Sequence, residues 1–296
     1  MKISVLTAAY NRSKSINKLY ESLLKNSNGT ADLEWLIMDD GSTDDTKLKI
    51  ENYINSSNFE IKYFYQENQG KMAAVNNLTE YASGDLIIEC DSDDYLTDNA
   101  IEIITAKYES IKDLTNIYAL VFLKYDQNLC NIGSVFKNDG YKSTMFDLYF
   151  KDGLTGDKAL VFITDVRKQY KYILEKDEKF VTEARMYNQM DKFFNVICFN
   201  NPIMICEYLG DGYSNNILKI FMDNPYGYLE YFKALFSFDM KGILFKKRLY
   251  IIKHYILFCY LTKERHVLKD VRGGFNKFLV SILFIPGYIK SYCTIV

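Results

Sequence analysis

Residues 86–94 read LIIECDSDD, a short apolar run that ends in a group of acidic side chains. The apolar part predicts a buried strand over Leu86–Glu89, and the carboxylates lie where that strand would end. A carboxylate pair taken alone is equally typical of a solvated surface turn. The rest of the sequence has to decide between these two interpretations.

Three earlier apolar runs have the same layout, over Ile3–Ala8, Leu33–Met38 and Ile61–Tyr65. Polar clusters follow them at residues 7–11, 39–42 and 67–71. The alternation of strand and helix patterns predicts an α/β fold with parallel strands and right-handed crossovers. Such sheets bind ligands beyond the carboxyl ends of their strands, so the four polar clusters should converge on one cleft.

Helical periodicity separates these strands. We expect a first helix capped by Ser13, a second from about Thr43 and a third opened by Gly70. Their predicted apolar faces are, in order, Ile16, Leu19, Tyr20, Leu23 and Leu24; Leu48, Ile50 and Ile54; and Met72, Val75 and Leu78.

The second half is less regular. Ile117–Tyr125 and Lys158–Thr164 are predicted strands, and Asn195–Tyr208 resembles a strand broken at Asn201–Pro202. Thr182 is a candidate cap for a helix with Glu183 in its first turn. The apolar face of that helix would hold Met186, Met190 and Phe193.

From about Ile217 the pattern becomes helical, aromatic and basic. Residues 241–296 hold eleven Lys and Arg against two Asp and Glu, a net of +9, whereas residues 1–240 carry a net of −11. The chain therefore divides into three predicted segments: 1–110, 111–215 and 216–296.

Six scattered cysteines without a C-x-x-C pair predict reduced, buried thiols of a cytoplasmic protein. The two histidines both lie in the basic tail, which excludes a histidine-based zinc enzyme in the acidic body. The apolar run at the N-terminus is too short for a signal peptide and is better explained as the first strand.

Asp91 and Asp93 are two residues apart, and in an extended segment their side chains would point to opposite sides. One could then bind a divalent cation while the other reaches a sugar or ribose. Mg²⁺ and Mn²⁺ suit this role because they keep water and phosphate oxygens as ligands. Asp39 or Asp40 could likewise contact a base or ribose, or simply belong to the turn before the next helix.

These motifs together resemble family 2 glycosyltransferases of the GT-A fold. The resemblance rests on VLTAAYN at 5–11, LIMDDGSTD at 36–44, NQGK at 68–71 and DSDD at 91–94. GDKA at 156–159, FVTE at 180–183 and EYLGDGYS at 207–214 are similar to members that build bacterial capsular and other surface polysaccharides. The resemblance covers about residues 1–215 and leaves the tail aside.

The resemblance implies a role for each matching residue. Nucleotide-sugar contacts would come from Thr7, Tyr10, Asp40, Asn68, Lys71 and Asp91, with Asp40 reading the base, by resemblance uracil. Asp93 would bind Mn²⁺ or Mg²⁺, with Asp91 beside it. Glu183 would be the general base, or else a first-turn carboxylate favoured by the helix dipole. Because Ala184-Arg185 departs from the fuller acidic motif of the family, Asp157 and Asp211 are held as alternative bases.

The implied activity is an inverting, metal-dependent transfer from a UDP-sugar to a glycan acceptor, which the resemblance suggests is lipid-linked. The only tryptophan is Trp35, so the Gln-x-x-Arg-Trp motif of processive synthases is absent and one sugar per acceptor is expected. A sugar-nucleotide nucleotidyltransferase would need a glycine-rich loop where the chain has Ala8-Ala9-Tyr10-Asn11. A non-catalytic donor-binding or scaffold subunit remains the other alternative.

The tail alternates basic with aromatic and aliphatic residues and has no clean apolar run of about 20 residues. This pattern favours a helix on an anionic membrane surface, and so a protein peripheral to the inner face of the cell membrane. Packing on the body or contact in a homo-oligomer would give the same pattern. No recognised motif supports nucleic-acid binding.

Overall fold

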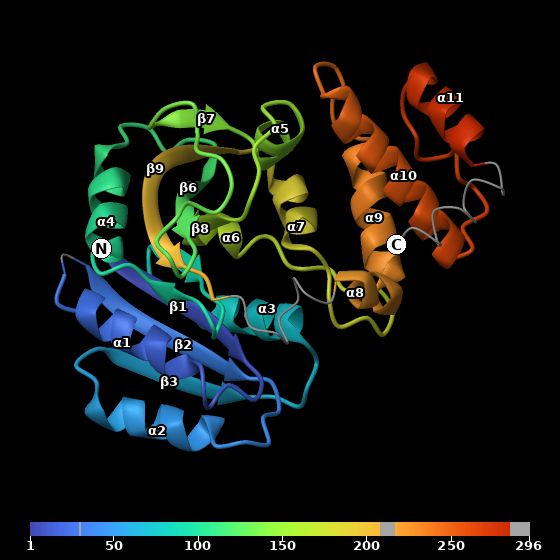
Figure 1. The fold of residues 1–296 in the computed structure, drawn as a ribbon. Coiled ribbons are helices and arrows are strands. Elements are labelled where there is room, and N and C mark those ends of the chain that lie inside the picture. Colours follow the sequence, from blue (N-terminus) through green and yellow to red (C-terminus); the bar gives the residue numbers. More distant parts are fainter. Residues whose placement is uncertain (30, 208–216, 285–296) are drawn as a thin grey trace.

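The computed structural model describes residues 1–29, 31–207 and 217–284, which form a nine-stranded sheet with helices on both faces (Figure 1). The strands are β1 (Lys2–Ala9), β2 (Asp32–Asp39), β3 (Glu60–Tyr65), β4 (Leu86–Glu89), β5 (Tyr95–Leu96), β6 (Ile117–Tyr125), β7 (Tyr141–Ser143), β8 (Lys158–Ile163) and β9 (Asn195–Ile205). The helices are α1 (Ile16–Asn26), α2 (Thr46–Ser56), α3 (Lys71–Tyr81), α4 (Ala100–Ser110), α5 (Met145–Phe150), α6 (Thr164–Arg167), α7 (Glu183–Met190), α8 (Ile217–Asp223), α9 (Pro225–Leu235), α10 (Phe245–Leu261) and α11 (Gly274–Leu283). The predicted α/β class is confirmed.

The strand order is β3-β2-β1-β4-β8-β6-β9-β5, with β7 paired to β9. β1 lies between β2 and β4 and is parallel to both, and β3 is parallel to β2, as the alternating pattern predicts. β8 departs from that pattern because it is antiparallel to both β4 and β6. The two halves of the chain therefore share one mixed, mostly parallel sheet.

Three predictions about the first helices are wrong. Leu24, predicted for the apolar face of α1, is exposed. Ser13 does not cap α1, which begins at Ile16; its main-chain N–H donates to the Asp44 carboxylate instead. Leu48 and Ile54 are exposed on α2, which turns Ile50 and Tyr53 inward. Leu48 lies almost opposite Ile50 because an α-helix turns once in 3.6 residues.

The second half needs similar corrections. Phe193 lies beyond the end of α7 and is 68% exposed, so it is not part of the apolar face of that helix. β9 runs unbroken through Asn201 and Pro202. Proline lacks an N–H, and the register between β6 and β9 shifts around Leu123, the partner of Pro202. Among the cysteines of the described ranges, all free, Cys130 is exposed rather than buried.

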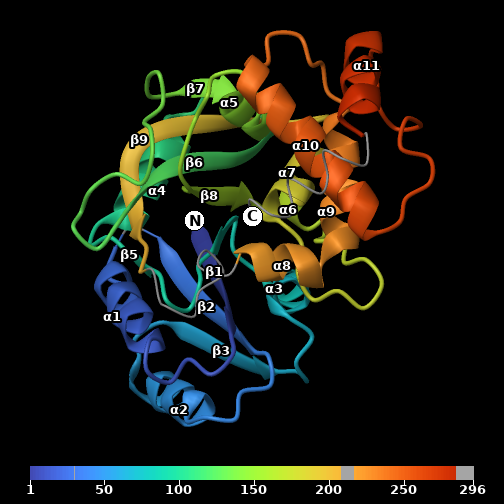
Figure 2. The ribbon, with the colours of Figure 1, turned by 45° about the vertical axis from the view of Figure 1, so that its right-hand side comes forward.

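Three apolar clusters hold the layers together. One face of the sheet packs on α1, α2 and α4, and the other face packs on α3, α5 and α7 (Figure 1). The third cluster joins α5 to the C-terminal helices through Phe146, Phe232 and Phe258. α9 also contacts α7, so the tail packs on the body (Figure 2).

Glu34 on β2 is a fully buried carboxylate that links three neighbouring segments. It accepts hydrogen bonds from the Ser4 hydroxyl of β1 (2.6 Å) and from the main-chain N–H of Ser83, just before β4 (2.7 Å). Its Oε2 lies 3.0 Å from the Lys2 ammonium. Burial alone would raise the pKa of Glu34, but these donors outweigh it and lower the pKa to about 2.

Within the part of the chain that the structure describes, no helix combines the length and the apolar content needed to cross a bilayer. The 17-residue α10 buries Ile251, Ile252 and Phe258 against its neighbours. Its predicted membrane contact can therefore involve only its outward face.

Candidate active site

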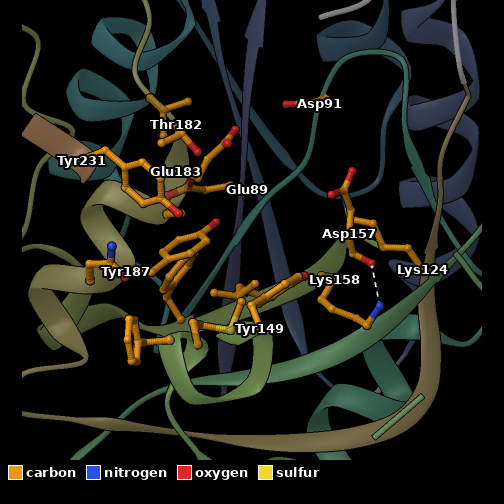
Figure 3. A pocket seen from close by; sticks show the side chains of 18 of the residues that line it. Glu89, Asp91, Lys124, Tyr149, Asp157, Lys158, Thr182, Glu183, Tyr187 and Tyr231 are labelled. Carbon is orange, nitrogen blue, oxygen red and sulfur yellow. Dashed lines mark hydrogen bonds between the residues drawn. The ribbon is translucent and has the colours of Figure 1, made fainter. Parts of the chain in front are cut away.

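A cavity of about 440 Å³ lies beyond the carboxyl ends of β1 and β4 and reaches the C-terminal helices (Figure 3). Its polar lining includes Lys71, Asp91 and Glu183, which lie far apart in the sequence. Further lining comes from Glu89, Lys124, Tyr149, Asp157, Lys158, Tyr187, Tyr231, Lys247 and Tyr250. The position is the one expected for a ligand site in a mostly parallel sheet.

Lys71 is the centre of this cavity's charge network. Its Nζ lies 2.7 Å from Asp91 Oδ1 and 3.1 Å from Glu183 Oε1. Burial lowers the pKa of Lys71, but the two carboxylates outweigh this and raise it well above its ordinary value, so the ammonium stays charged. Lys71 and Glu183 are the first residues of α3 and α7, which brings two helix N-termini to one place.

Asp91 and Asp93 lie on a tight turn, closed by a hydrogen bond from Asp94 N to Asp91 O (3.0 Å). The extended conformation that we predicted for this segment is therefore wrong. Asp94 pairs instead with Lys124, at 3.3 Å. Burial, together with the charges of Asp91 and Asp94, raises the pKa of Asp93 to about 6.

The turn at residues 91–94 carries carboxylate oxygens, which are the ligands that Mg²⁺ and Mn²⁺ prefer. Asp91 and Asp93 offer hard carboxylate oxygens, and Asp94 adds a third carboxylate to the same turn. Within residues 1–29, 31–207 and 217–284, no cluster of three or more acidic, His or Cys side chains could hold a metal by itself. Mg²⁺ or Mn²⁺ does not need one, because phosphate oxygens and water complete the coordination. The residues present therefore fit a cation that is held jointly with a diphosphate.

Asp40 is buried and organises the loop before α3. Its carboxylate accepts hydrogen bonds from Gln66 Nε2 (2.7 Å), Gln69 N (2.8 Å) and Gly70 N (2.8 Å). Gly70 has a φ of +93°, and a Cβ there would lie 2.3 Å from Lys179 O, so only glycine fits. The structure thus gives Asp40 a role in placing Lys71, while its contact with a base stays a prediction.

The other predicted nucleotide contacts lie outside the cavity lining. Tyr10 is 47% exposed after β1. Asn68 donates to Asp40 O (3.0 Å) from the loop before α3. The Thr7 side chain is fully buried on the opposite face of the sheet, where its hydroxyl accepts from Trp35 Nε1 (2.9 Å). Thr7 is therefore not exposed for side-chain contact with a nucleotide.

Of the two alternative bases, Asp157 lines the cavity, and Asp211 lies outside the described residues. The Asp157 side chain points into the cavity (Figure 3). The neighbouring Lys158 donates to four main-chain oxygens, at 2.8 to 3.3 Å. These hydrogen bonds connect the loop at Ile132 to residues 155–157. Burial lowers the pKa of Lys158 to about 8.

Residues 175–182, which we call the strap, precede α7, and their first part, residues 175–179, was missed because it follows no periodic pattern. Lys179 Nζ donates to the main-chain and side-chain oxygens of Asn68 (2.9 Å each). Glu178 accepts from Tyr226 N (2.6 Å) and Gly227 N (2.7 Å) at the start of α9. The strap therefore connects the loop before α3 to the C-terminal helices.

The sheet order and the carboxylates at the strand ends define a protein of the GT-A type. The chain belongs to glycosyl transferase family 2, whose family model matches residues 4–168. The predicted membership is thereby confirmed.

Known proteins similar to this chain include polysaccharide synthases. Chondroitin synthase of Escherichia coli is 32% identical over 154 residues, which are 52% of this chain and 21% of the synthase. The chain spans about a third or less of the length of the curated relatives that it matches first.

Solved structures support the fold. Staphylococcus aureus TarS in complex with UDP-GlcNAc superimposes with a TM-score of 0.64 at 18% identity, covering 99% of this chain and 92% of that one. A mannosyltransferase of Pyrobaculum calidifontis in complex with GDP-Man and Mn²⁺ gives 0.58 at 11% identity, covering 99% and 83%. At these identities the likeness concerns the fold alone.

Proposed function

We propose that this protein is an inverting, metal-dependent glycosyltransferase that moves one sugar from a UDP-sugar to an acceptor hydroxyl. The observation that carries the proposal is the Lys71 ammonium between Asp91 and Glu183 in one cavity. The UDP-GlcNAc complex of TarS supports a uridine donor. In this proposal residues 1–110 bind the donor, 111–215 face the acceptor, and 216–296 form the C-terminal extension.

The reaction follows from where the charges lie. Glu183 accepts the proton of the acceptor hydroxyl while that oxygen forms a bond to the anomeric carbon. The bond from the anomeric carbon to the diphosphate oxygen breaks in the same step, which inverts the configuration. Lys71 offsets the charge that develops on the departing diphosphate.

A metal would be held by Asp93, with Asp91 beside it. When bound there, Mn²⁺ or Mg²⁺ would supply positive charge next to the diphosphate. The GDP-Man and Mn²⁺ complex of the mannosyltransferase supports this proposal. Asp40, Asn68 and Tyr10 would surround the nucleotide.

We further propose a lipid-linked glycan acceptor in bacterial surface polysaccharide synthesis, on the cytoplasmic face of the membrane. The names of chondroitin synthase and of the poly(ribitol-phosphate) β-N-acetylglucosaminyltransferase TarS support a role in polymer synthesis, and the name of the similar GalNAc(5)-diNAcBac-PP-undecaprenol β-1,3-glucosyltransferase supports a lipid-linked acceptor. α11 exposes Phe275, Phe278 and Ile282 at helical spacing, with basic Lys277 between them. This face suits an anionic membrane surface.

Calorimetry with UDP and GDP, each with Mn²⁺ and with a chelator, tests the donor site. We expect UDP to bind only with metal and to lose binding in Asp93→Ala. If neither nucleotide binds, the enzyme proposal fails. If UDP binds but no UDP-sugar is ever hydrolysed or transferred, the chain is a donor-binding subunit.

A further inference from the structure

The C-terminal helices supply part of the cavity wall. Tyr231 comes from α9, and Lys247 and Tyr250 come from α10. Tyr149 of α5 and Tyr187 of α7 line the same cavity. Figure 3 shows the side chains of Tyr149, Tyr187 and Tyr231 gathered on the same side of the cavity as Glu183.

Some charged groups of this cavity form hydrogen bonds or ion pairs with other protein groups, and others do not. Lys71 and Lys124 form ion pairs, and Lys158 is held by main-chain oxygens. In the part of the chain that the structure describes, no hydrogen bond or ion pair reaches the Lys247 ammonium or the Asp157 carboxylate. One donor group and one acceptor group thus remain for a ligand.

The hydroxyls of Tyr187 and Tyr231 also have no hydrogen-bond partner among the described residues. Burial raises both pKa values far above the ordinary value. Tyr149 is different, because its hydroxyl donates to Gly156 O (2.7 Å). Phenol groups that line a cavity without protein partners are suited to hydrogen bonding with a polar ligand.

We propose that this region, the tyrosine pocket (Tyr149, Tyr187, Tyr231, Tyr250, Asp157 and Lys247), binds the terminal pyranose of the acceptor. The inference rests on the proposed transferase function and extends it to the acceptor. Aromatic rings pack against the C–H faces of a sugar ring, while phenol, carboxylate and ammonium groups bond its hydroxyls. The C-terminal helices then determine which acceptor reaches Glu183.

Saturation-transfer NMR with methyl glucoside, methyl galactoside and methyl N-acetylglucosaminide on UDP-saturated protein tests the pocket. We expect at least one glycoside to bind, with its ring protons saturated. Lys247→Met should weaken that binding at least about tenfold, the effect of one lost hydrogen bond to a charged group. Tyr231→Leu should weaken it at least about twofold, the effect of one lost ring contact. The affinity for UDP should not change.

Two matched variants control for nonspecific effects. Lys246→Met changes the exposed neighbour of Lys247, and Tyr260→Leu changes a tyrosine of α10 outside the cavity lining. Both should bind the glycoside as wild type does. If Tyr231→Leu does not fold, Lys247→Met still tests the pocket, because Lys247 is only partly buried on α10.

The result that overturns the inference is UDP binding by wild type with no glycoside bound, or with glycoside binding equal in all variants. If the wild-type protein does not bind UDP, that result would instead count against the transferase proposal. The two failures are therefore distinguishable.

Discussion

Replacing Lys71 with methionine removes the cation between Asp91 and Glu183 while keeping an apolar chain of similar length. The two ion-pair distances, 2.7 and 3.1 Å, place the carboxylates no more than about 6 Å apart through Nζ. Two negative charges at that separation repel by about 3 kcal/mol at an effective dielectric constant of about 20. Asp91 is 47% and Glu183 34% exposed, and solvent screening lowers the value to between roughly 1 and 3 kcal/mol.

This energy corresponds to a loss of about 5- to 150-fold in kcat/KM for Lys71→Met, since each 1.4 kcal/mol is about tenfold. The assay is release of UDP from a UDP-sugar that wild type has been shown to use. Lys71→Arg should recover part of the rate, because it restores the charge with a different geometry. Lys171→Met, which removes an exposed pair with Glu80, is the matched control.

A Lys71→Met enzyme within about twofold of wild type would refute this reasoning. It would mean that Asp91 and Glu183 do not need the ammonium between them for transfer. Equal losses in Lys71→Met and Lys171→Met would point to a general effect of surface charge.

Three further predictions concern other parts of the fold. Glu183→Gln should keep UDP affinity within a few-fold and lower transfer by about 10²- to 10⁴-fold in single-turnover assays; unchanged transfer would remove Glu183 as the base. Glu34→Gln should lower the free energy of unfolding by about 3 kcal/mol in urea at neutral pH, because the pKa is about 2 against 4.5 for an ordinary glutamate. That contribution is present above about pH 4.5 and is lost toward pH 2, so a difference from wild type that did not shrink on acidification would contradict it. Glu178→Ala should speed amide exchange at the start of α9 about tenfold or more, because it removes the acceptor of the Tyr226 and Gly227 N–H groups, whereas Asp177→Ala should not; equal rates in the two variants would argue that these two hydrogen bonds do not protect the helix start.

The first four strands could be predicted because apolar runs end at polar clusters and parallel strands share one direction. β4 and β6 begin and end at the predicted residues. The antiparallel insertion of β8 could not be predicted, since it depends on pairing between residues 86–88 and 161–163, far apart in the chain.

The candidate site divides in the same way. Lys71, Asp91 and Glu183 were named from motif resemblance, and the structure brings them together. Thr7 matched a motif, but strand alternation turns its side chain to the opposite face. The tyrosines of the pocket were missed because Tyr187 and Tyr231 have the helical spacing of ordinary core residues.

The strap has a consequence for how such proteins can be recombined. Glu178 accepts hydrogen bonds from the start of α9, and Lys179 donates one to Asn68. One short segment is therefore bonded both to the C-terminal helices and to the loop before α3. A chimaera joined after residue 216 would separate the C-terminal helices from the strap that matches them. Exchanging acceptor preference between relatives should therefore require a crossover before residue 175, with the strap inherited together with the helices.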